Sequence, residues 1–148
     1  MPRLVFETVM PVPPQALWEF HSSVQALTRL SPPGASVTVL SDDLEVREGA
    51  LHVLSIRRGL IPLSWEALIS EVVPGRQFRD TAVKSPFKYW THLHEFLEHP
   101  SGSLLRDTVD FTFHLPFMEG LLAKDVTKLF EHRHRVTREM LAGSSLGS

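Results

Sequence analysis

Cysteine is absent from the 148-residue sequence. A disulfide framework, a thiolate zinc site and a cysteine nucleophile are therefore all excluded. Long apolar runs are also absent. Residues 1–14 lack the uninterrupted apolar stretch of a signal peptide, and no later stretch approaches the ~20 apolar residues that cross a bilayer. We therefore expect a cytoplasmic protein without an integral membrane segment.

An excess of charge of one sign is missing as well. Fifteen lysines and arginines stand against seventeen aspartates and glutamates, which gives a formal net charge of −2. Without a global positive field, nucleic acid is not an expected partner. The hydrophobic fraction of 43% and the charged fraction of 22% are typical of a globular protein. We expect one domain over residues 1–142 and a disordered Gly/Ser-rich tail over 143–148.

The N-terminal part of the chain predicts one strand followed by two short helices. Apolar and polar residues alternate from 4 to 10, and the alternation stops at Pro11, which indicates a strand. Pro13 and Pro14 suit the first turn of a helix. Ser22 and Gln25 have the spacing of a capping box, which predicts a second short helix ending before residues 31–34.

The middle of the chain predicts an antiparallel sheet. Six stretches are rich in β-branched or aromatic residues and are separated by turn residues: 37–40, 51–58, 63–73, 77–83, 89–97 and 104–114. Their connections are too short for parallel crossovers, so neighbouring strands must run antiparallel. With the first strand, we expect a sheet of six to seven strands.

The last segment predicts one long amphipathic helix, from about residue 119 to 141. Its apolar residues recur at helical spacing: Leu122, Val126, Leu129, Phe130, Val136 and Met140. The overall class is therefore α+β. A twisted antiparallel sheet of this size curls, and one helix covers only part of its concave face, so we expect a cavity between them.

Loop lengths predict how three of the strands pair. With a tight turn at 74–75, Trp65, Ala67 and Ile69 share a face with Asp80 and its alternate neighbours. The next two connections then place Asp80 roughly opposite His92, and Asp107 roughly opposite His94. The alternate residues Arg106, Thr108, Asp110, Thr112 and His114 are expected to face water.

These elements carry a recognisable series of residues along the chain. In order they are Phe6, the Pro-Pro-Gln-Ala-Leu-Trp stretch ending at Trp18, Leu27 to Leu30 with Ser31-Pro32-Pro33, Gly49, Trp65, Pro74-Gly75, Phe78, Asp80, Pro86-Phe87, Trp90, His92, His94, Phe96, and Asp107 before Val109. The series resembles the START/Bet v1-like superfamily, also called SRPBCC, and more closely its bacterial ligand-binding members. The resemblance covers about residues 4–141. It implies the helix-grip fold with a central hydrophobic cavity.

The resemblance also suggests a range of functions. Relatives of this kind bind lipids, sterols, polyketides or hormones, and a minority catalyse cyclisation or hydrolysis. We therefore expect a carrier or sensor for a small hydrophobic molecule, lipid-like, polyketide-like or aromatic, rather than an enzyme. Two alternatives stay open: a cyclase, dehydratase or hydrolase that uses a His–Asp pair, and a protein-interaction domain. A monomer and a homodimer are both compatible with the sequence.

Two imidazoles and two carboxylates share the expected inner face of the sheet: Asp80, His92, His94 and Asp107. Burying such groups is costly unless they pair, so we expect mutual hydrogen bonds. Three roles are open. They can form a satisfied structural cluster that fixes strand register, a polar anchor for a ligand carbonyl or hydroxyl, or a general acid/base pair.

The His92-Leu93-His94 spacing also places two imidazoles on one face of a strand, as a metal site requires. Asp80 or Asp107 is available as the third ligand. No further histidine is expected on that face, because His114 is predicted to point outward. We therefore expect neither a metal nor another cofactor.

The long helix contributes Arg133, which lies on its apolar stripe. The guanidinium can receive a ligand carboxylate, or its stem can lie on the core with its head in water or paired with a sheet carboxylate. His132, His134, Arg135 and Arg138 are interpreted as a solvated basic end. The full set of expected ligand contacts is Trp65, Phe78, Asp80, Trp90, His92, His94, Asp107, Val109, Phe111, Leu129, Phe130 and Arg133.

Overall fold

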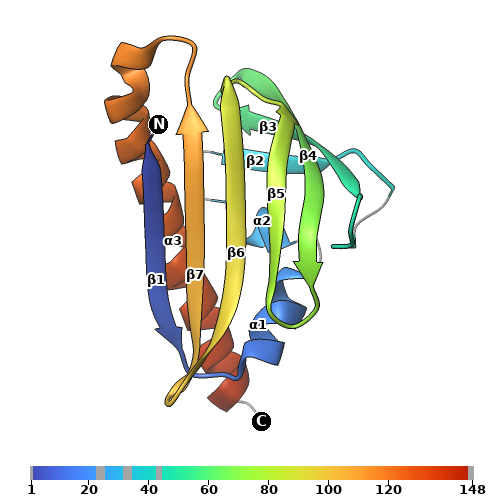
Figure 1. The fold of residues 1–148 in the computed structure, drawn as a ribbon, viewed down its shortest axis with the longest axis vertical. Helices are drawn as coiled ribbons and strands as arrows, with labels where there is room; N and C mark the ends of the chain where they lie inside the picture. Colours follow the sequence, from blue (N-terminus) through green and yellow to red (C-terminus); the bar gives the residue numbers. More distant parts are fainter. Residues whose placement is uncertain (1, 23–25, 32–34, 43–44, 147–148) are drawn as a thin grey trace.

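One antiparallel sheet of seven strands forms the body of the protein, as Figure 1 shows. The computed structural model describes residues 2–22, 26–31, 35–42 and 45–146. The strands are β1 (Arg3–Met10), β2 (Ala35–Val39), β3 (Leu51–Arg58), β4 (Ile61–Val73), β5 (Gln77–Lys84), β6 (Tyr89–His99) and β7 (Gly102–Thr112). Their order is β1-β7-β6-β5-β4-β3-β2, so every strand from β2 to β7 pairs with its neighbour in sequence, and β1 adds at the far edge.

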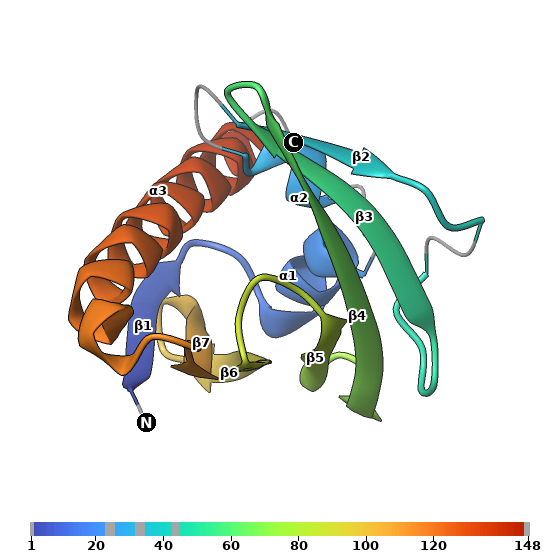
Figure 2. The same cartoon turned by 90° about the horizontal axis from the view of Figure 1, so that it is seen from above.

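The helices complete the helix-grip arrangement that the sequence predicts. They are α1 (Pro14–His21), α2 (Ala26–Arg29), the short 3₁₀ helix η1 (Pro116–Met118) and α3 (Glu119–Leu146). Seen from above, the sheet curves and α3 lies along its concave side (Figure 2). None of the helices in the described part of the chain is long and apolar enough to cross a membrane.

Two helix boundaries differ from the sequence-based expectation. The helix α3 continues to Leu146, into the segment 143–148 that the composition predicts to be a disordered tail. Extending an existing helix forms one bond for each residue that is fixed, so weak helix formers can be added at its end. Ser22 ends α1 as its C-cap, and its hydroxyl donates to the Glu19 carbonyl at 3.0 Å. Gln25, the other half of the expected capping box, lies outside the described residues.

The strand register that places the polar residues is confirmed. Asp80 is paired with His92 between β5 and β6, and His94 with Asp107 between β6 and β7. Between β4 and β5, Ala67 is paired with Ala82 and Ile69 with Asp80. Side chains alternate between the two faces of a strand, so this register places all four polar residues on the concave face.

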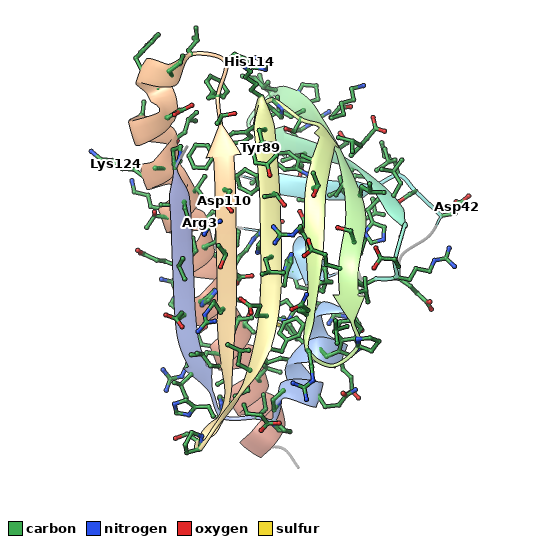
Figure 3. All side chains as sticks on the ribbon, in the orientation of Figure 1. Arg3, Asp42, Tyr89, Asp110, His114 and Lys124 are labelled. Carbon is green, nitrogen blue, oxygen red and sulfur yellow. The ribbon has the colours of Figure 1, made fainter. Side chains whose placement is uncertain are left out.

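The outer face of β7 contains one departure from the expected pattern. The alternation predicts that Asp110 faces water, but it is only 8% exposed. Arg3 on the edge strand β1 covers it and donates from Nε and Nη2 to its carboxylate oxygens at 2.7 and 3.1 Å. Figure 3 shows the two side chains on neighbouring strands. His114, beyond the end of β7, is exposed as expected.

Two apolar clusters fill the concave side of the sheet, one near each end. The first, which we call the lower cluster, is built around Met10, Leu17, Ala50, Ile69, Phe78, Phe96, Leu105 and Leu141. The second, the upper cluster, is built around Trp90, Val109, Phe111, Val126 and Phe130, with Trp65, Phe87 and Leu129 packed against it. Along β6, His92 and His94 lie between Trp90 and Phe96. The polar residues therefore occupy the gap between the two clusters.

Replacing Gly102 by alanine is expected to destabilise the fold by about 1–3 kcal/mol, as for other strained backbone positions. Gly102 has φ +138°, and an added Cβ would lie 2.5 Å from the Met10 carbonyl oxygen and 2.9 Å from Val12 N. Gly59→Ala is the matched control: its φ is also positive, at +64°, but nothing lies within 4 Å. Thermal unfolding should show a larger loss for Gly102→Ala, and equal losses would contradict the close approach.

Candidate functional site

Five polar side chains from four elements meet at the centre of the concave face. They are Asp80 from β5, His92 and His94 from β6, Asp107 from β7 and His134 from α3, and we call them the His–Asp cluster. All but Asp80 are buried, and the Asp80 side chain is only 17% exposed. The sequence predicts the first four, whereas it places His134 in a solvated basic end.

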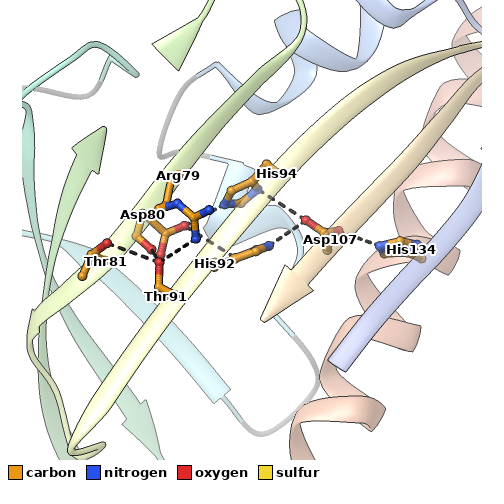
Figure 4. Close-up of polar contacts among 8 residues, drawn as sticks. All are labelled: Arg79, Asp80, Thr81, Thr91, His92, His94, Asp107 and His134. Carbon is orange, nitrogen blue, oxygen red and sulfur yellow. Dashed lines mark hydrogen bonds and ion pairs between the residues drawn. The ribbon is translucent and has the colours of Figure 1, made fainter. Parts of the chain in front are cut away.

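Short hydrogen bonds connect the His–Asp cluster into a chain (Figure 4). His92 Nε2 donates to Asp107 Oδ1 at 2.6 Å, and His134 Nε2 donates to Asp107 Oδ2 at 2.6 Å. His94 Nε2 donates to Asp80 Oδ2 at 2.6 Å. Two longer contacts of 3.5 Å, His92 Nδ1 to Asp80 Oδ2 and His94 Nδ1 to Asp107 Oδ1, bring each carboxylate close to both strand imidazoles.

The far side of His134 reaches the edge of the sheet. Its Nδ1 lies 2.7 Å from the hydroxyl oxygen of Thr8 on β1. Because Nε2 carries the proton donated to Asp107, a neutral His134 accepts the Thr8 hydroxyl at Nδ1. The ring of His134 is thereby fixed at both ends.

The electrostatics of the cluster favour ionised carboxylates. Burial alone would raise the pKa of Asp107, but the neighbouring His92 and the hydrogen bonds from His134 and His92 hold it well below its usual value. The same balance lowers the pKa of Asp80, with His94 as the main hydrogen-bond donor. Burial lowers the pKa of His92, which favours its neutral form.

A cavity of about 70 Å³ adjoins the cluster. Five of the eight histidines in the sequence line it. The complete lining is His21, Ala26, Leu30, Val46, His52, Phe78, Asp80, His92, His94, Leu105, Asp107, Phe130, Arg133, His134 and Thr137. The lining thus combines an apolar wall with an unusual concentration of titratable groups.

Two donors in this lining have no hydrogen-bond partner among the described residues. They are Arg133 Nε and Thr137 Oγ1, one turn apart on α3, and both atoms are buried. The Arg133 guanidinium carbon lies 5.1 Å from the centre of the Phe130 ring, and burial lowers the pKa of this arginine. One sequence-based interpretation places the head of Arg133 in water. The Nε atom of that head is instead buried.

The remaining residues predicted to contact a ligand fall into two groups. Phe78 and Phe130 line the cavity: Phe78 stacks on His94 with ring centres 4.0 Å apart, and Phe130 meets His92 edge-on at 4.9 Å. The other five pack into the upper cluster and do not line the cavity: Trp65, Trp90, Val109, Phe111 and Leu129. The four strand residues share the concave face but lie further along the strands, and Leu129 packs against this cluster from α3.

Three histidines of the lining are not among the residues that the sequence predicts. His134 lies on the buried stripe of α3, four residues after Phe130 and three before Thr137, and this spacing was the available signal. His21 ends α1, where its Nδ1 donates to the Leu17 carbonyl at 2.8 Å. His52 on β3 donates from Nε2 to the Glu45 carbonyl at 2.8 Å. The last two are local contacts that no sequence pattern indicates.

A second, larger hollow of about 680 Å³ lies between β1 and α3, and we call it the surface groove. It is lined by Val5, Phe6, Glu7, Thr8, Phe130, Glu131, His134, Arg135, Arg138, Glu139 and Ala142. Phe130 and His134 line both the groove and the cavity. These two side chains therefore separate the two spaces.

The likeness to solved structures extends over nearly the whole chain. A crystal structure from Chromobacterium violaceum has a TM-score of 0.78 at 15% identity, covering 95% of this chain and 98% of that one. One from Thermus thermophilus has a TM-score of 0.70 at 20% identity, covering 97% and 99%. The crystal structure of Ara h 8.0201 has a TM-score of 0.72 at 14% identity, covering 96% and 98%. At these identities the likeness establishes the fold.

The family is established by the sequence itself. No curated protein matched the chain. Residues 10–138, however, match the family described as polyketide cyclase / dehydrase and lipid transport. This match spans the upper cluster, the lower cluster except Leu141, the cavity lining and most of α3. The chain therefore belongs to the polyketide cyclase / dehydrase and lipid transport family, within the START/Bet v1-like (SRPBCC) superfamily.

Proposed function

We propose that the protein binds a small, largely apolar molecule that presents an oxygen acceptor to the cavity between the sheet and α3, as a carrier or sensor. The observation that carries the proposal is the pair of unpartnered donors, Arg133 Nε and Thr137 Oγ1. A buried donor without a partner loses its hydration without compensation, so such groups mark a place where an acceptor from outside completes the structure. A ligand carbonyl or carboxylate supplies that acceptor.

The size of the cavity limits what it receives in this conformation. About 70 Å³ is the liquid volume of roughly two water molecules, whereas pockets for larger ligands measure about 300–1,000 Å³. The surface groove, at about 680 Å³, falls in that range. We propose that the polar end of the ligand enters the cavity, and that its apolar body takes up space opened when Phe130 moves and His134 gives up its hydrogen bond to Thr8.

Binding should be measured with 1-naphthoate, an aromatic carboxylate, by isothermal titration. Arg133→Met is expected to weaken saturable binding about 10–100-fold, and Thr137→Val about 2–10-fold, the ranges for charged and neutral hydrogen bonds. Thr127→Val is the matched control, because the Thr127 hydroxyl already donates to the Ala123 carbonyl at 2.8 Å and does not line the cavity. Absence of saturable binding, or equal affinity in all variants, would contradict the proposal.

An acid–base enzyme is the second candidate, and the hydrogen-bonded pairs His92–Asp107 and His94–Asp80 favour it. Each pair faces the cavity, and a carboxylate that holds an imidazole in one orientation is a common device in proton transfer. His92→Ala and His94→Ala separate the two functions. A pure binder forms no product that depends on either histidine, whereas an enzyme loses turnover in both variants.

A protein-interaction role, as a monomer or a homodimer, is the third candidate. Large apolar side chains are exposed at the β3–β4 turn and before α3: Leu60 at 93%, Ile61 at 65% and Phe117 at 81%. The sequence also offers the proline-rich loop at 32–33 for this role, and these residues lie outside the described part of the chain. Sedimentation of the pure protein as a strict monomer would count against a homodimer through these groups.

A further inference from the structure

We propose that Asp80, His92 and His94 form a binding site for a divalent transition-metal ion of the zinc type. Each residue offers one ligand atom, and the three atoms all lie within 4.8 Å of one another. The proposal concerns the ion alone and does not rest on the small-molecule ligand. It reverses the expectation drawn from the sequence, which left Asp80 and Asp107 as alternative third ligands and predicted no metal.

The sheet supplies the geometry of the site. His92 and His94 are two residues apart on β6, so both imidazoles point to the concave face, and Asp80 lies opposite His92 on β5. Asp80 Oδ2 is 3.5 Å from His92 Nδ1 and 2.6 Å from His94 Nε2. Ligand atoms about 2.1 Å from a tetrahedral zinc ion lie about 3.4 Å apart. The first distance already fits, and the second must lengthen by less than about 1 Å.

The outer contacts of the two imidazoles match those of metal-bound histidines, which usually donate their other ring nitrogen to a carboxylate. His92 uses Nδ1 toward Asp80, and its Nε2 donates to Asp107 Oδ1 at 2.6 Å. His94 uses Nε2 toward Asp80, and its Nδ1 lies 3.5 Å from the same Asp107 oxygen. His134 Nε2 donates to the second oxygen of Asp107, Oδ2, at 2.6 Å. One buried carboxylate thus orients both proposed ligands.

Metal binding changes the protonation of His94 and the net charge of the site, but not the protonation of His92. His92 binds as the neutral tautomer that it already shows, with the proton on Nε2. His94 now donates from Nε2 to Asp80, so the ion takes the place of that proton, and the proton on His94 moves to Nδ1, toward Asp107. Two carboxylates and the Arg133 guanidinium sum to −1 near the site, and a divalent ion brings the sum to +1.

The donor set indicates the class of ion. Two imidazole nitrogens and one carboxylate oxygen suit zinc and similar transition metals, whereas magnesium and calcium prefer oxygen ligands. Three protein ligands leave a fourth position, which is the arrangement of zinc sites that keep an exchangeable water. The adjoining cavity of about 70 Å³ has room for that water.

The test is titration of EDTA-treated protein with Zn²⁺ and with Co²⁺. We expect one equivalent to bind and the Co²⁺ complex to show the intense visible absorption of a tetrahedral site. Asp80→Asn and His94→Gln should lower the affinity more than tenfold, and Asp107→Asn about 10–100-fold. His52→Gln is the matched control, since His52 also lines the cavity but bonds the Glu45 carbonyl. It should leave the affinity unchanged.

Two results would overturn the proposal of a metal site. Binding that survives in Asp80→Asn and His94→Gln, or Co²⁺ without tetrahedral absorption in the wild type, excludes the site. Should a variant fail to fold, ring signals of the wild-type histidines decide: Zn²⁺ must shift those of His92 and His94 and spare His52. The titration with 1-naphthoate is run in EDTA, so failure of one proposal leaves the other standing.

Discussion

Asp107→Ala is expected to lower the free energy of unfolding by roughly 3–5 kcal/mol, the range for removing one partner of a buried charged pair. Asp107 is 5% exposed, and its carboxylate accepts 2.6 Å hydrogen bonds from both His92 and His134. Without it, two buried imidazole N–H groups lose their acceptor, and the strand and α3 lose a shared contact. Urea unfolding at pH 7, followed by tryptophan fluorescence, measures the change.

Asp110→Ala is the matched control on the same strand. Asp110 is also buried, at 8% exposed, but its partner Arg3 has a side chain that is 68% exposed. Water screens a pair with an exposed partner, so the loss in Asp110→Ala should be much smaller than in Asp107→Ala. Equal losses in Asp107→Ala and Asp110→Ala would show that the His–Asp cluster does not hold the sheet and α3 together.

Acidification from pH 7 to pH 4 is expected to remove about 3 kcal/mol of stability through His21 alone. Burial lowers the pKa of His21 from 6.5 to about 4. In the folded protein His21 therefore stays neutral at a pH where the same side chain in the unfolded chain binds a proton. The stabilisation that His21 contributes is fully present above pH 6.5. It is lost as the pH falls toward the pKa of His21 in the folded protein. Urea unfolding at steps of pH measures the slope.

Neighbouring charged groups modify the pKa of His21, and two variants test its share of the pH effect. Asp107 partly offsets the burial by favouring the charged form, whereas His94 and His134 oppose it when they are charged. His21→Gln should flatten the decline between pH 6.5 and 4, and the exposed His114→Gln should leave it unchanged. A decline of the same size in His21→Gln and in the wild type would refute the role of His21.

The sheet and its register could be predicted from the sequence because short turns and period-two alternation leave few ways to pair the strands. The pairing of Asp80 with His92, and of His94 with Asp107, follows from loop lengths alone. Strand patterns and turn positions therefore suffice to bring the four polar residues of the sheet together.

The part contributed by α3 could not be derived in the same way. The position and rotation of a helix over a sheet depend on the volumes of all the side chains between them, and a strand pattern does not contain these volumes. Trp65, Trp90 and Phe111 consequently proved to fill the upper cluster, and His134 to reach Asp107. The cavity is small and rich in imidazoles, where the resemblance implied a hydrophobic one.

Ligand binding at Arg133 is tested by the NMR signal of its Nε–H group during addition of 1-naphthoate. This donor is buried without a partner among the described residues, and we expect the ligand oxygen to become its partner. The Arg133 signal should shift to saturation, while that of the exposed Arg3, already bonded to Asp110, stays in place. Naphthoate bound at saturation with an unmoved Arg133 signal would show that the ligand does not bind at this donor.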